Sequence, residues 1–185
     1  MNLNIQNKNA LVCGSTQGIG LATAILLAEE GVNVTLIARN EEKLKKTVAQ
    51  LPNKNQCHGY LVADFSKPKE LKEVLANSDL QFHILVNNTG GPAGGPIFKA
   101  KIEEFESAFT QHLKCNHLLV QCLVPFMKTQ CFGRIINVIS TSVKQPLEGL
   151  GVSNTIRGAV ASWSKTLANE LGEFGITVNN VLPGA

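Results

Sequence analysis

The sequence is poor in aromatic residues and holds one tyrosine and one tryptophan, Tyr60 and Trp163. It also lacks a long apolar run, since each hydrophobic stretch is too short to span a bilayer. Residues 1–6 have neither the charged start nor the apolar core of a signal peptide. These absences predict a cytoplasmic protein with no membrane partner.

The chain also lacks a large excess of positive or negative charge. The net charge is +3 at pH 7, and the densest basic run, residues 42–46, has the spacing of a solvated helix face. Nucleic-acid binding normally needs a stronger basic patch, so we expect no nucleic acid as a partner.

Cysteine and histidine show none of the spacings that mark disulfide frameworks or metal sites. The cysteines are odd in number and have no C-x-x-C pair, so they are predicted to be reduced and mostly buried: Cys13, Cys57, Cys115, Cys122 and Cys131. The histidines are interpreted as structural: His58, His83, His112 and His117. The sequence therefore predicts no metal site.

What the chain does contain is a regular alternation of apolar runs and helical patterns. With 185 residues and 44% hydrophobic composition, it has the size of one domain, residues 1–185. Six apolar runs predict buried parallel strands at residues 9–13, 32–38, 57–63, 82–87, 134–139 and 177–181. Strands that alternate with helical crossovers predict an α/β fold, a Rossmann-type doubly wound parallel sheet with helices on both faces.

The helical patterns have recognisable starts and stops. Helices are expected over residues 18–30, 41–51, 67–77, 102–130 and 153–172. Ser66 is expected to be the N-cap of the third helix, with Pro68 early in it. The fourth pattern is long enough that Pro125 should kink or end it.

A glycine-rich turn lies between the first strand and the first helix, and the chain is organised around it. Gly14 suits a tight turn, Gly18 a close approach to a pyrophosphate, and Gly20 a contact of helix with strand. A helix that starts in glycines presents free N–H groups and its positive dipole end, which suit a phosphate. The predicted dinucleotide site also includes the other residues of this turn: Ser15, Thr16, Gln17 and Ile19. The alternative is an ordinary glycine turn.

The end of the second strand bears on the choice of cofactor. An acidic residue there would bind the ribose 2′-hydroxyl of NAD, whereas Ala38 is followed by Arg39 and Asn40, which favours NADP(H) over NAD(H). The alternative is a surface arginine that opens the second helix.

Polar residues also follow the third and fourth strands. Asp64 and Phe65 could offer a carboxylate and a ring to an adenine, or could begin the turn into the third helix. Residues 87–90 end the fourth strand with short polar side chains, which could bind ribose or simply form a turn. Asn88, Thr89 and Gly90 are therefore candidate cofactor contacts.

Five elements in order and spacing resemble the short-chain dehydrogenase/reductase family over the whole chain. They are the glycine turn, Asp64, residues 87–90 in place of N-N-A-G, Asn116, and residues 179–184. The resemblance implies hydride transfer between NADP(H) and a small carbonyl or alcohol, and is broadest to the 3-oxoacyl-acyl-carrier-protein reductase branch. It implies that the glycine turn, Asp64, Asn88 and the pair Pro183 and Gly184 contact the cofactor.

The catalytic residues of that family are only partly present. Ser140 stands at the position of the family serine and Asn116 at that of its asparagine, but Ser153 and Arg157 replace the Y-x-x-x-K pair. A tyrosine pKa starts near 10 and can be lowered by a neighbouring cation, whereas an aliphatic hydroxyl starts far higher. Arg157 can supply positive potential and bind ribose, but it stays charged and passes no proton. Tyr60, in the third strand, cannot substitute.

Two accounts of the chemistry stay open. In a divergent reductase, Ser140 or Ser142 would orient the carbonyl while Lys144 or a bound water supplies the proton. Lys144 could equally be a solvated loop charge. In the second account, the chain keeps the cofactor cradle but acts as a nucleotide-sensing or assembly subunit.

The resemblance also bears on length and assembly. Family members usually continue past the sixth strand with a covering loop, further helices and another strand, so the C-terminal part is expected to be missing after Ala185. In the family, the outer faces of helices that correspond to residues 105–124 and 160–171 pair across a two-fold axis. A homodimer or homotetramer is therefore expected by resemblance.

Overall fold

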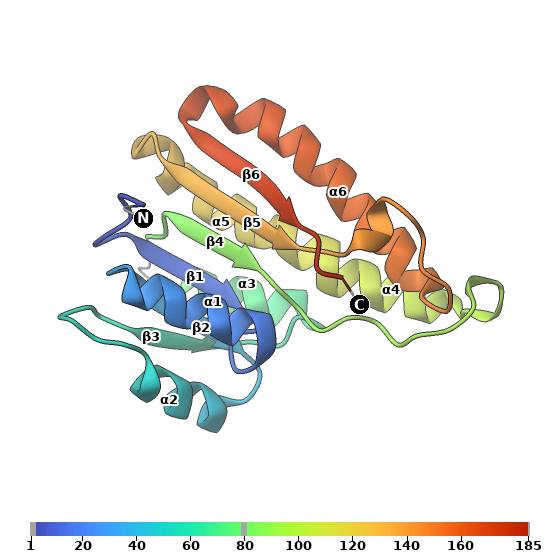
Figure 1. The fold of residues 1–185 in the computed structure, drawn as a ribbon, viewed down its shortest axis with the longest axis horizontal. Coiled ribbons are helices and arrows are strands. Elements are labelled where there is room, and N and C mark those ends of the chain that lie inside the picture. The colour runs from blue at the N-terminus through green and yellow to red at the C-terminus, as the bar shows by residue number, and fades with distance from the viewer. Residues whose placement is uncertain (1–2, 79–80, 185) are drawn as a thin grey trace.

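The computed structural model of the protein describes residues 3–78 and 81–184. Residues 1 and 2, which belong to the segment without signal-peptide features, and Ala185 lie outside the described residues. Within the described chain, six parallel strands form one sheet in the order β3-β2-β1-β4-β5-β6 (Figure 1). The strands are β1 (Asn9–Cys13), β2 (Asn33–Ala38), β3 (Gly59–Val62), β4 (Ile84–Asn87), β5 (Gly133–Val138) and β6 (Ile176–Val181). The predicted Rossmann-type sheet is confirmed.

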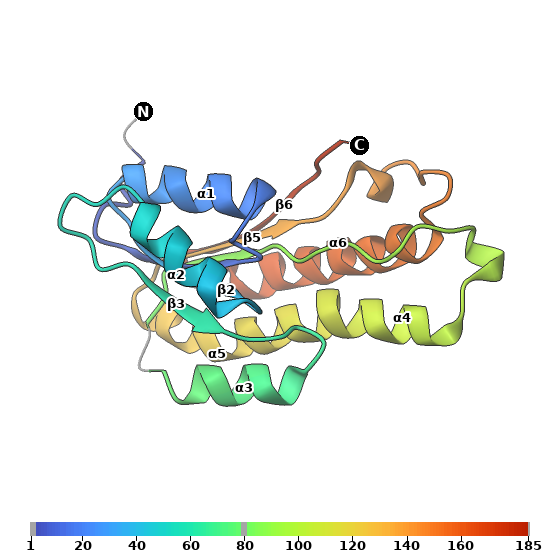
Figure 2. The same ribbon diagram turned by 90° about the horizontal axis from the view of Figure 1, so that it is seen from below.

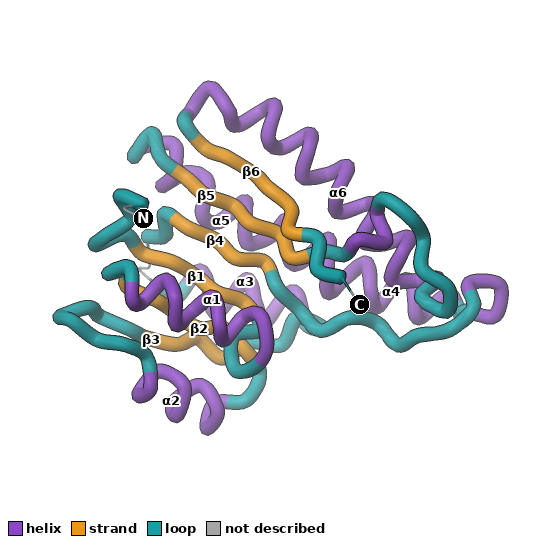
Figure 3. The backbone as a smooth tube through the Cα atoms, in the orientation of Figure 1, coloured by secondary structure: helices purple, strands orange, loops and turns teal. Residues whose placement is uncertain are grey.

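Helices cover the sheet on both faces (Figure 2). One face carries α1 (Gly18–Glu29) and α2 (Glu41–Gln50). The other carries α3 (Pro68–Ala76), α5 (Cys115–Thr129) and α6 (Gly151–Leu171), with α4 (Ile102–Phe109) leading into α5. The loops that follow β4 and β5 extend beyond the carboxyl ends of the strands toward α4 and the start of α6 (Figure 3).

Strand β1 illustrates why these residues form a central strand. Successive side chains in a strand point to opposite faces. Leu11 and Cys13 therefore pack in the core under α3, α5 and α6, while Ala10 and Val12 pack in the core under α1 and α2. All four are fully buried, so an uninterrupted apolar run is what this position requires.

The helix predicted over residues 102–130 is divided into three segments. A π-helical turn, η2 (Thr110–Lys114), separates α4 from α5. Pro125 lies inside α5, which continues to Thr129, so the expectation that Pro125 might end the helix is wrong. The irregularity lies instead at η2, which turns His112 into the interior.

Short 3₁₀ turns complete the described chain: η1 (Ile97–Lys99), η3 (Thr141–Val143) and η4 (Gly172–Phe174). The expected N-cap of α3 is also corrected, because Lys67 occupies that position instead of Ser66. The carboxylate of Asp64 accepts a hydrogen bond from the Ser66 N–H at 2.8 Å, so Ser66 belongs to the turn that precedes the helix.

The cysteines are free thiols, as predicted, but the expectation that most are buried is wrong. Cys13 and Cys115 are buried, whereas Cys57, Cys122 and Cys131 are exposed on loops and on the outer face of α5. No group of potential metal ligands gathers among the described residues. None of the described helices combines the length and apolarity needed to cross a bilayer.

A buried side-chain network joins the central strands to α6. The Asn137 side-chain oxygen accepts a hydrogen bond from Asn87 Nδ2 at 2.8 Å. Its amide nitrogen donates to Ser164 Oγ at 2.9 Å and to Asn180 Oδ1 at 3.2 Å. Asn137 is fully buried, so this amide links β4, β5, β6 and α6 in a region without water contact.

We expect Asn137→Ala to lower the free energy of unfolding by about 2–3 kcal/mol, because it leaves buried partners without hydrogen bonds. The measurement is urea unfolding followed by far-UV circular dichroism. Asn179→Ala is the matched control, since Asn179 is exposed in the neighbouring strand β6. Equal losses of stability in the two variants would contradict the role assigned to the network.

Candidate functional site

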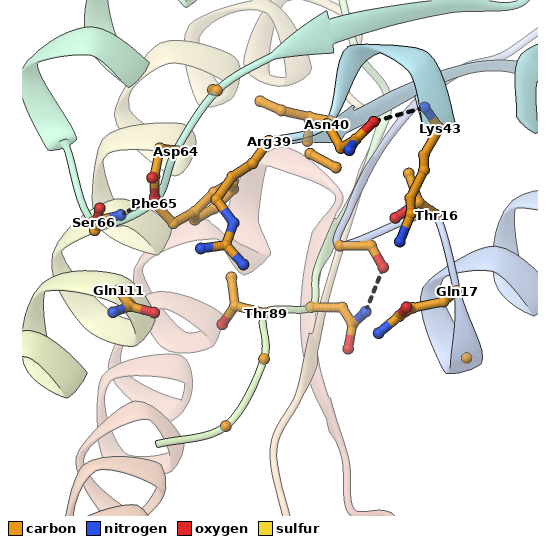
Figure 4. Close-up of a pocket in the computed structure, with 18 residues that line it drawn as sticks. Thr16, Gln17, Arg39, Asn40, Lys43, Asp64, Phe65, Ser66, Thr89 and Gln111 are labelled. Atoms are coloured by element: carbon orange, nitrogen blue, oxygen red, sulfur yellow. Dashed lines mark hydrogen bonds between the residues drawn. The ribbon is translucent and has the colours of Figure 1, made fainter. Parts of the chain in front are cut away.

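A cavity of about 500 Å³ opens at the carboxyl ends of β1, β2, β3 and β4 (Figure 4). Its position is the crevice where ligands bind in open α/β sheets. Most of the predicted cofactor contacts line it: Gly14, Thr16, Gln17, Gly18, Arg39, Asn40, Asp64, Phe65, Asn88, Thr89 and Gly90. The other turn residues, Ser15, Ile19 and Gly20, lie in or beside the turn without lining the cavity.

The glycine turn is held by Asn88, which follows β4. Asn88 Nδ2 donates to the carbonyl oxygens of Cys13 at 3.3 Å and Gly14 at 3.2 Å. Gly14 has a φ of 57°, and a Cβ added there would lie 2.4 Å from Asn88 O. A Cβ on Gly20 would lie 2.3 Å from Gly14 O. Gly20 therefore lets α1 approach the residue that follows β1 and makes room for Asn88.

The turn leaves the start of α1 open toward the cavity. Gly18 has a φ of 56°, and nothing lies within 4 Å of the place a Cβ would take. The N-cap residue Gln17 gives no side-chain hydrogen bond to the helix, and the first turn has no acidic residue. Ser15 Oγ is buried and finds no partner among the described residues. Free amides at the start of α1 and the open face of Gly18 fit the diphosphate of a dinucleotide.

Two cations point into this cavity from the segment after β2. Figure 4 shows the side chains of Arg39 and Lys43 directed into the space between Thr16 and Thr89. Lys43 is exposed, as expected for the basic run at residues 42–46, and it also lines the cavity, which was not predicted. Asn40 Oδ1 caps α2 by accepting from the Lys43 N–H at 2.9 Å. Recognition of Asn40 as the N-cap would have put Lys43 in the first turn, beside the cavity.

The acidic neighbours of Lys43 are engaged elsewhere. Lys45 Nζ lies 3.1 Å from Glu41 Oε1 and 3.5 Å from Glu42 Oε1. Glu41 also accepts a hydrogen bond from the Tyr60 hydroxyl at 3.2 Å. Both glutamates therefore pair with Lys45, and the cavity keeps the cations Arg39 and Lys43 for an anionic group.

Asp64 both lines the cavity and shapes the turn, so the two interpretations of its role are compatible. Burial acts to raise the pKa of Asp64, but hydrogen bonds from Ser66 and the charges of Arg39 and Lys67 bring it below its ordinary value. Asp64 is thus a carboxylate at neutral pH. The next residue, Phe65, is buried, and its carbonyl accepts a hydrogen bond from Cys115 Sγ at 3.1 Å.

His112, interpreted from the sequence as structural, supports the loop after β4. Thr89 Oγ1 and His112 Nδ1 are 2.6 Å apart, and His112 is 1% exposed. Burial, and secondarily the charge of Arg157, lowers the pKa of His112 to about 3, so the ring is neutral. The π-helical turn that directs His112 inward leaves no clear mark in the sequence. Further cavity residues not predicted are Ser66, Gly91 and Gln111.

The predicted catalytic residues lie on the other side of this loop, and none of them lines the cavity within the described chain. Ser140 follows β5, and its Oγ accepts a hydrogen bond from the Ser142 N–H at 3.1 Å, which leaves its own proton free to donate. Arg157 is buried, its Nη1 donates to Val138 O at 2.9 Å, and burial lowers its pKa. Asn116 is buried and its Oδ1 is unpartnered among the described residues.

The remaining predicted residues border the same region. Ser153 is half-buried near the start of α6, one turn before Arg157. Lys144 is exposed at the end of η3. Pro183 lies beside η3, because its carbonyl accepts a hydrogen bond from the Thr141 N–H at 3.2 Å, and Gly184 follows it as an exposed residue.

Comparison with known proteins gives one family. The model of the short chain dehydrogenase family matches residues 8–185. The 3-oxoacyl-[acyl-carrier-protein] reductase of Staphylococcus epidermidis is 34% identical over 184 residues, which cover 96% of this chain and 75% of the relative.

Solved structures agree with this result. The L-sorbose reductase of Gluconobacter frateurii, complexed with NADPH and L-sorbose, superimposes with a TM-score of 0.92 at 31% identity, covering 100% of this chain and 72% of that one. An NAD⁺-bound xylitol dehydrogenase has a TM-score of 0.89 at 28% identity, covering 97% of this chain and 71% of that one. Both nicotinamide cofactors therefore occur among the structural relatives.

The neutral state of His112 predicts a pH dependence of stability. The pKa of His112 is lower in the folded protein than in the unfolded chain. The folded state is therefore fully stable above about pH 6.5 and loses stability on acidification, when His112 is protonated in the unfolded chain. Between pH 7 and pH 5 this protonation should lower the free energy of unfolding by about 2 kcal/mol. Urea unfolding of the wild type and His112→Asn at both pH values measures the difference. An equal fall in unfolding free energy between pH 7 and pH 5 in the two proteins would show that His112 is not the cause.

Proposed function

We propose, from the premise that the chain belongs to the short chain dehydrogenase family, that it is an oxidoreductase that transfers hydride between NADP(H) and a carbonyl or alcohol substrate. The observation that carries the proposal is the cavity formed by the glycine turn, the open N-terminus of α1 and the cations Arg39 and Lys43. A bound nicotinamide cofactor would supply or accept the hydride. The residues of this chain supply binding, orientation and proton transfer.

The preference for NADP(H) rests on charge. A 2′-phosphate carries about two negative charges, and Arg39 and Lys43 both point into the cavity while Ala38 stands where an acidic residue would favour NAD(H). Since Glu41 and Glu42 are paired with Lys45, Lys43 is available for the phosphate. The L-sorbose reductase that superimposes on this chain is complexed with NADPH, which supports the same preference.

We expect Arg39→Ala and Lys43→Met each to weaken NADPH binding by roughly tenfold, since each removes a charge-assisted contact to the phosphate. NADH binding should hardly change. Isothermal titration calorimetry with both nucleotides gives the two affinities. Lys46→Met is the matched control, because Lys46 is exposed on α2 and does not line the cavity. Tighter binding of NADH than of NADPH by the wild type would overturn the preference.

The chemistry is assigned to the residues around the end of β5. The Ser140 hydroxyl, oriented by the hydrogen bond from the Ser142 N–H, donates to the substrate carbonyl. The buried cation Arg157 supplies positive potential and stays charged. Ser153 has an aliphatic hydroxyl, which is a poor acid, so the proton comes from Lys144 or from a bound water.

The substrate is proposed to be a small molecule with a ketone or secondary alcohol group. The similarity to a 3-oxoacyl-[acyl-carrier-protein] reductase extends the candidates to 3-oxoacyl thioesters.

The protein is further proposed to be a single-domain cytoplasmic homodimer or homotetramer. Ile102 and Phe109, exposed by 69% and 46% on α4, support an interface along α4 and α5.

The experiment that tests the proposal is NADPH consumption by the purified protein with a panel of ketones and acyl-thioester mimics. Ser140→Ala should lower kcat/KM by roughly 10²-fold, the usual cost of losing one hydrogen-bond donor to the reacting oxygen, and leave NADPH affinity unchanged. Ser162→Ala, an exposed position of α6, serves as its control. Lys144→Ala distinguishes the two proton donors, since only a lysine donor makes this variant slow.

The competing function is nucleotide sensing or subunit assembly without catalysis. It predicts NADPH binding with no turnover of any substrate. That result would overturn the oxidoreductase proposal while leaving the cofactor site intact.

A further inference from the structure

Two segments far apart in the sequence meet beyond the carboxyl ends of the strands. Residues 88–96 follow β4, and residues 144–150 precede α6 (Figure 1). Gly95 and Leu150 form an isolated parallel bridge. The Gly95 N–H donates to Gly149 O, and the Gly151 N–H donates to Gly95 O at 3.1 Å. The bridge thus joins the loop after β4 to the start of α6, outside the main sheet.

The contact requires a glycine at the first position of α6. A Cβ on Gly151 would lie 2.4 Å from Ile97 Cβ, 2.6 Å from Ile97 Cα and 2.7 Å from Ile97 N. Two of these three atoms belong to the backbone, so a different rotamer of Ile97 cannot relieve the overlap. A side chain at position 151 must push α6 and the loop apart.

The two sides of the bridge carry different parts of the proposed site. On the loop side, Asn88 is hydrogen-bonded to the glycine turn, and Thr89 lines the cofactor cavity. On the helix side, Ser153 follows Gly151 by two residues, and Arg157 is fixed to Val138 O one turn later. Asn154 Nδ2 also donates to Leu147 O at 2.8 Å, which holds the segment before α6 against the helix.

We propose that the Gly95–Leu150 bridge sets the distance between the bound cofactor and the buried cation Arg157, which contacts Val138 O near Ser140, and that Gly151 is the positioning residue that permits it. The inference rests on the proposed oxidoreductase function. Gly151 touches neither substrate nor cofactor in this scheme. Gly151 acts on the reaction through the position of the N-terminus of α6 and through the position of the loop that carries Thr89.

The test compares Gly151→Ala with Gly158→Ala in the same helix. Both add one methyl group to α6, but nothing lies within 4 Å of the Cβ position at Gly158. We expect Gly151→Ala to lower kcat by roughly ten- to a hundredfold, because a small misplacement of reacting groups is enough to slow the chemistry. Its NADPH affinity should stay within about twofold of the wild type, and Gly158→Ala should match the wild type in both.

A kinetic isotope effect separates positioning from general loss of structure. With NADPH deuterated at the transferred hydrogen, Gly151→Ala should give a larger isotope effect on kcat than the wild type, because hydride transfer becomes more rate-limiting. A variant that is merely less stable would lose active protein without a change in the isotope effect. Thermal unfolding of both variants is measured in parallel.

A second variant keeps the inference testable if Gly151→Ala does not fold. Gly95→Pro removes the N–H that donates to Gly149 O and puts the ring Cδ against that oxygen, so it breaks the bridge from the loop side. Like Gly151→Ala, it should lower kcat and leave NADPH affinity within about twofold of the wild type. Unchanged kcat in the folded variants, or a fall in kcat with an unchanged isotope effect, overturns the inference and leaves the proposed function standing. A wild type that binds NADPH but turns over no substrate overturns both.

Discussion

The hydrogen bonds from the Asn88 amide to Cys13 O and Gly14 O are the contact on which the rest of the site depends. They tie the turn after β1 to the loop after β4, the two neighbouring strands at the centre of the sheet. The close approach is possible only because positions 14 and 20 carry no Cβ. With this contact in place, the open start of α1 and the residues after β4 face one cavity.

Electrostatics then divides the region into two parts with different tasks. On the β2 side, Arg39 and Lys43 reach into solvent-accessible space, where cations can bind an anionic group at little desolvation cost. On the β5 side, Arg157 is buried against Val138 O, and the nearby His112 is neutral. The cavity therefore holds two exposed cations, whereas the buried cation Arg157 is hydrogen-bonded at the end of β5.

Much of the architecture could be predicted because parallel strands buried on both faces leave a direct mark in the sequence. The run of residues 9–13 is buried on both faces, and the six predicted strands agree with the observed ones to within two residues at every end. The glycine turn was equally readable, since backbone crowding at Gly14 and Gly20 excludes other residues. The assignment to the family follows from the same elements.

The parts that could not be predicted depend on helix phase and burial. Lys43, Lys45 and Lys46 look alike in one basic run, and only the cap at Asn40 turns Lys43 toward the cavity. His112 is directed inward by a π-helical turn, and Cys122 outward by the phase of α5. Pro125 fits within α5 because a proline interrupts a helix only through its missing N–H and its clash with the preceding turn, and both can be accommodated locally.

The strand order has a consequence for how the chain acquires its structure during synthesis. Strand β1 pairs with β4, so Ala10 must find Ile84, a partner many residues later, before the central pair of the sheet exists. Until β4 has left the ribosome, β1 has an unpaired apolar edge, and the hydrogen bonds from Asn88 to the glycine turn cannot form. Sequence-distant parallel pairing of this kind folds slowly. The nascent chain therefore passes through an interval in which it needs protection from aggregation, and nucleotide cannot yet stabilise it.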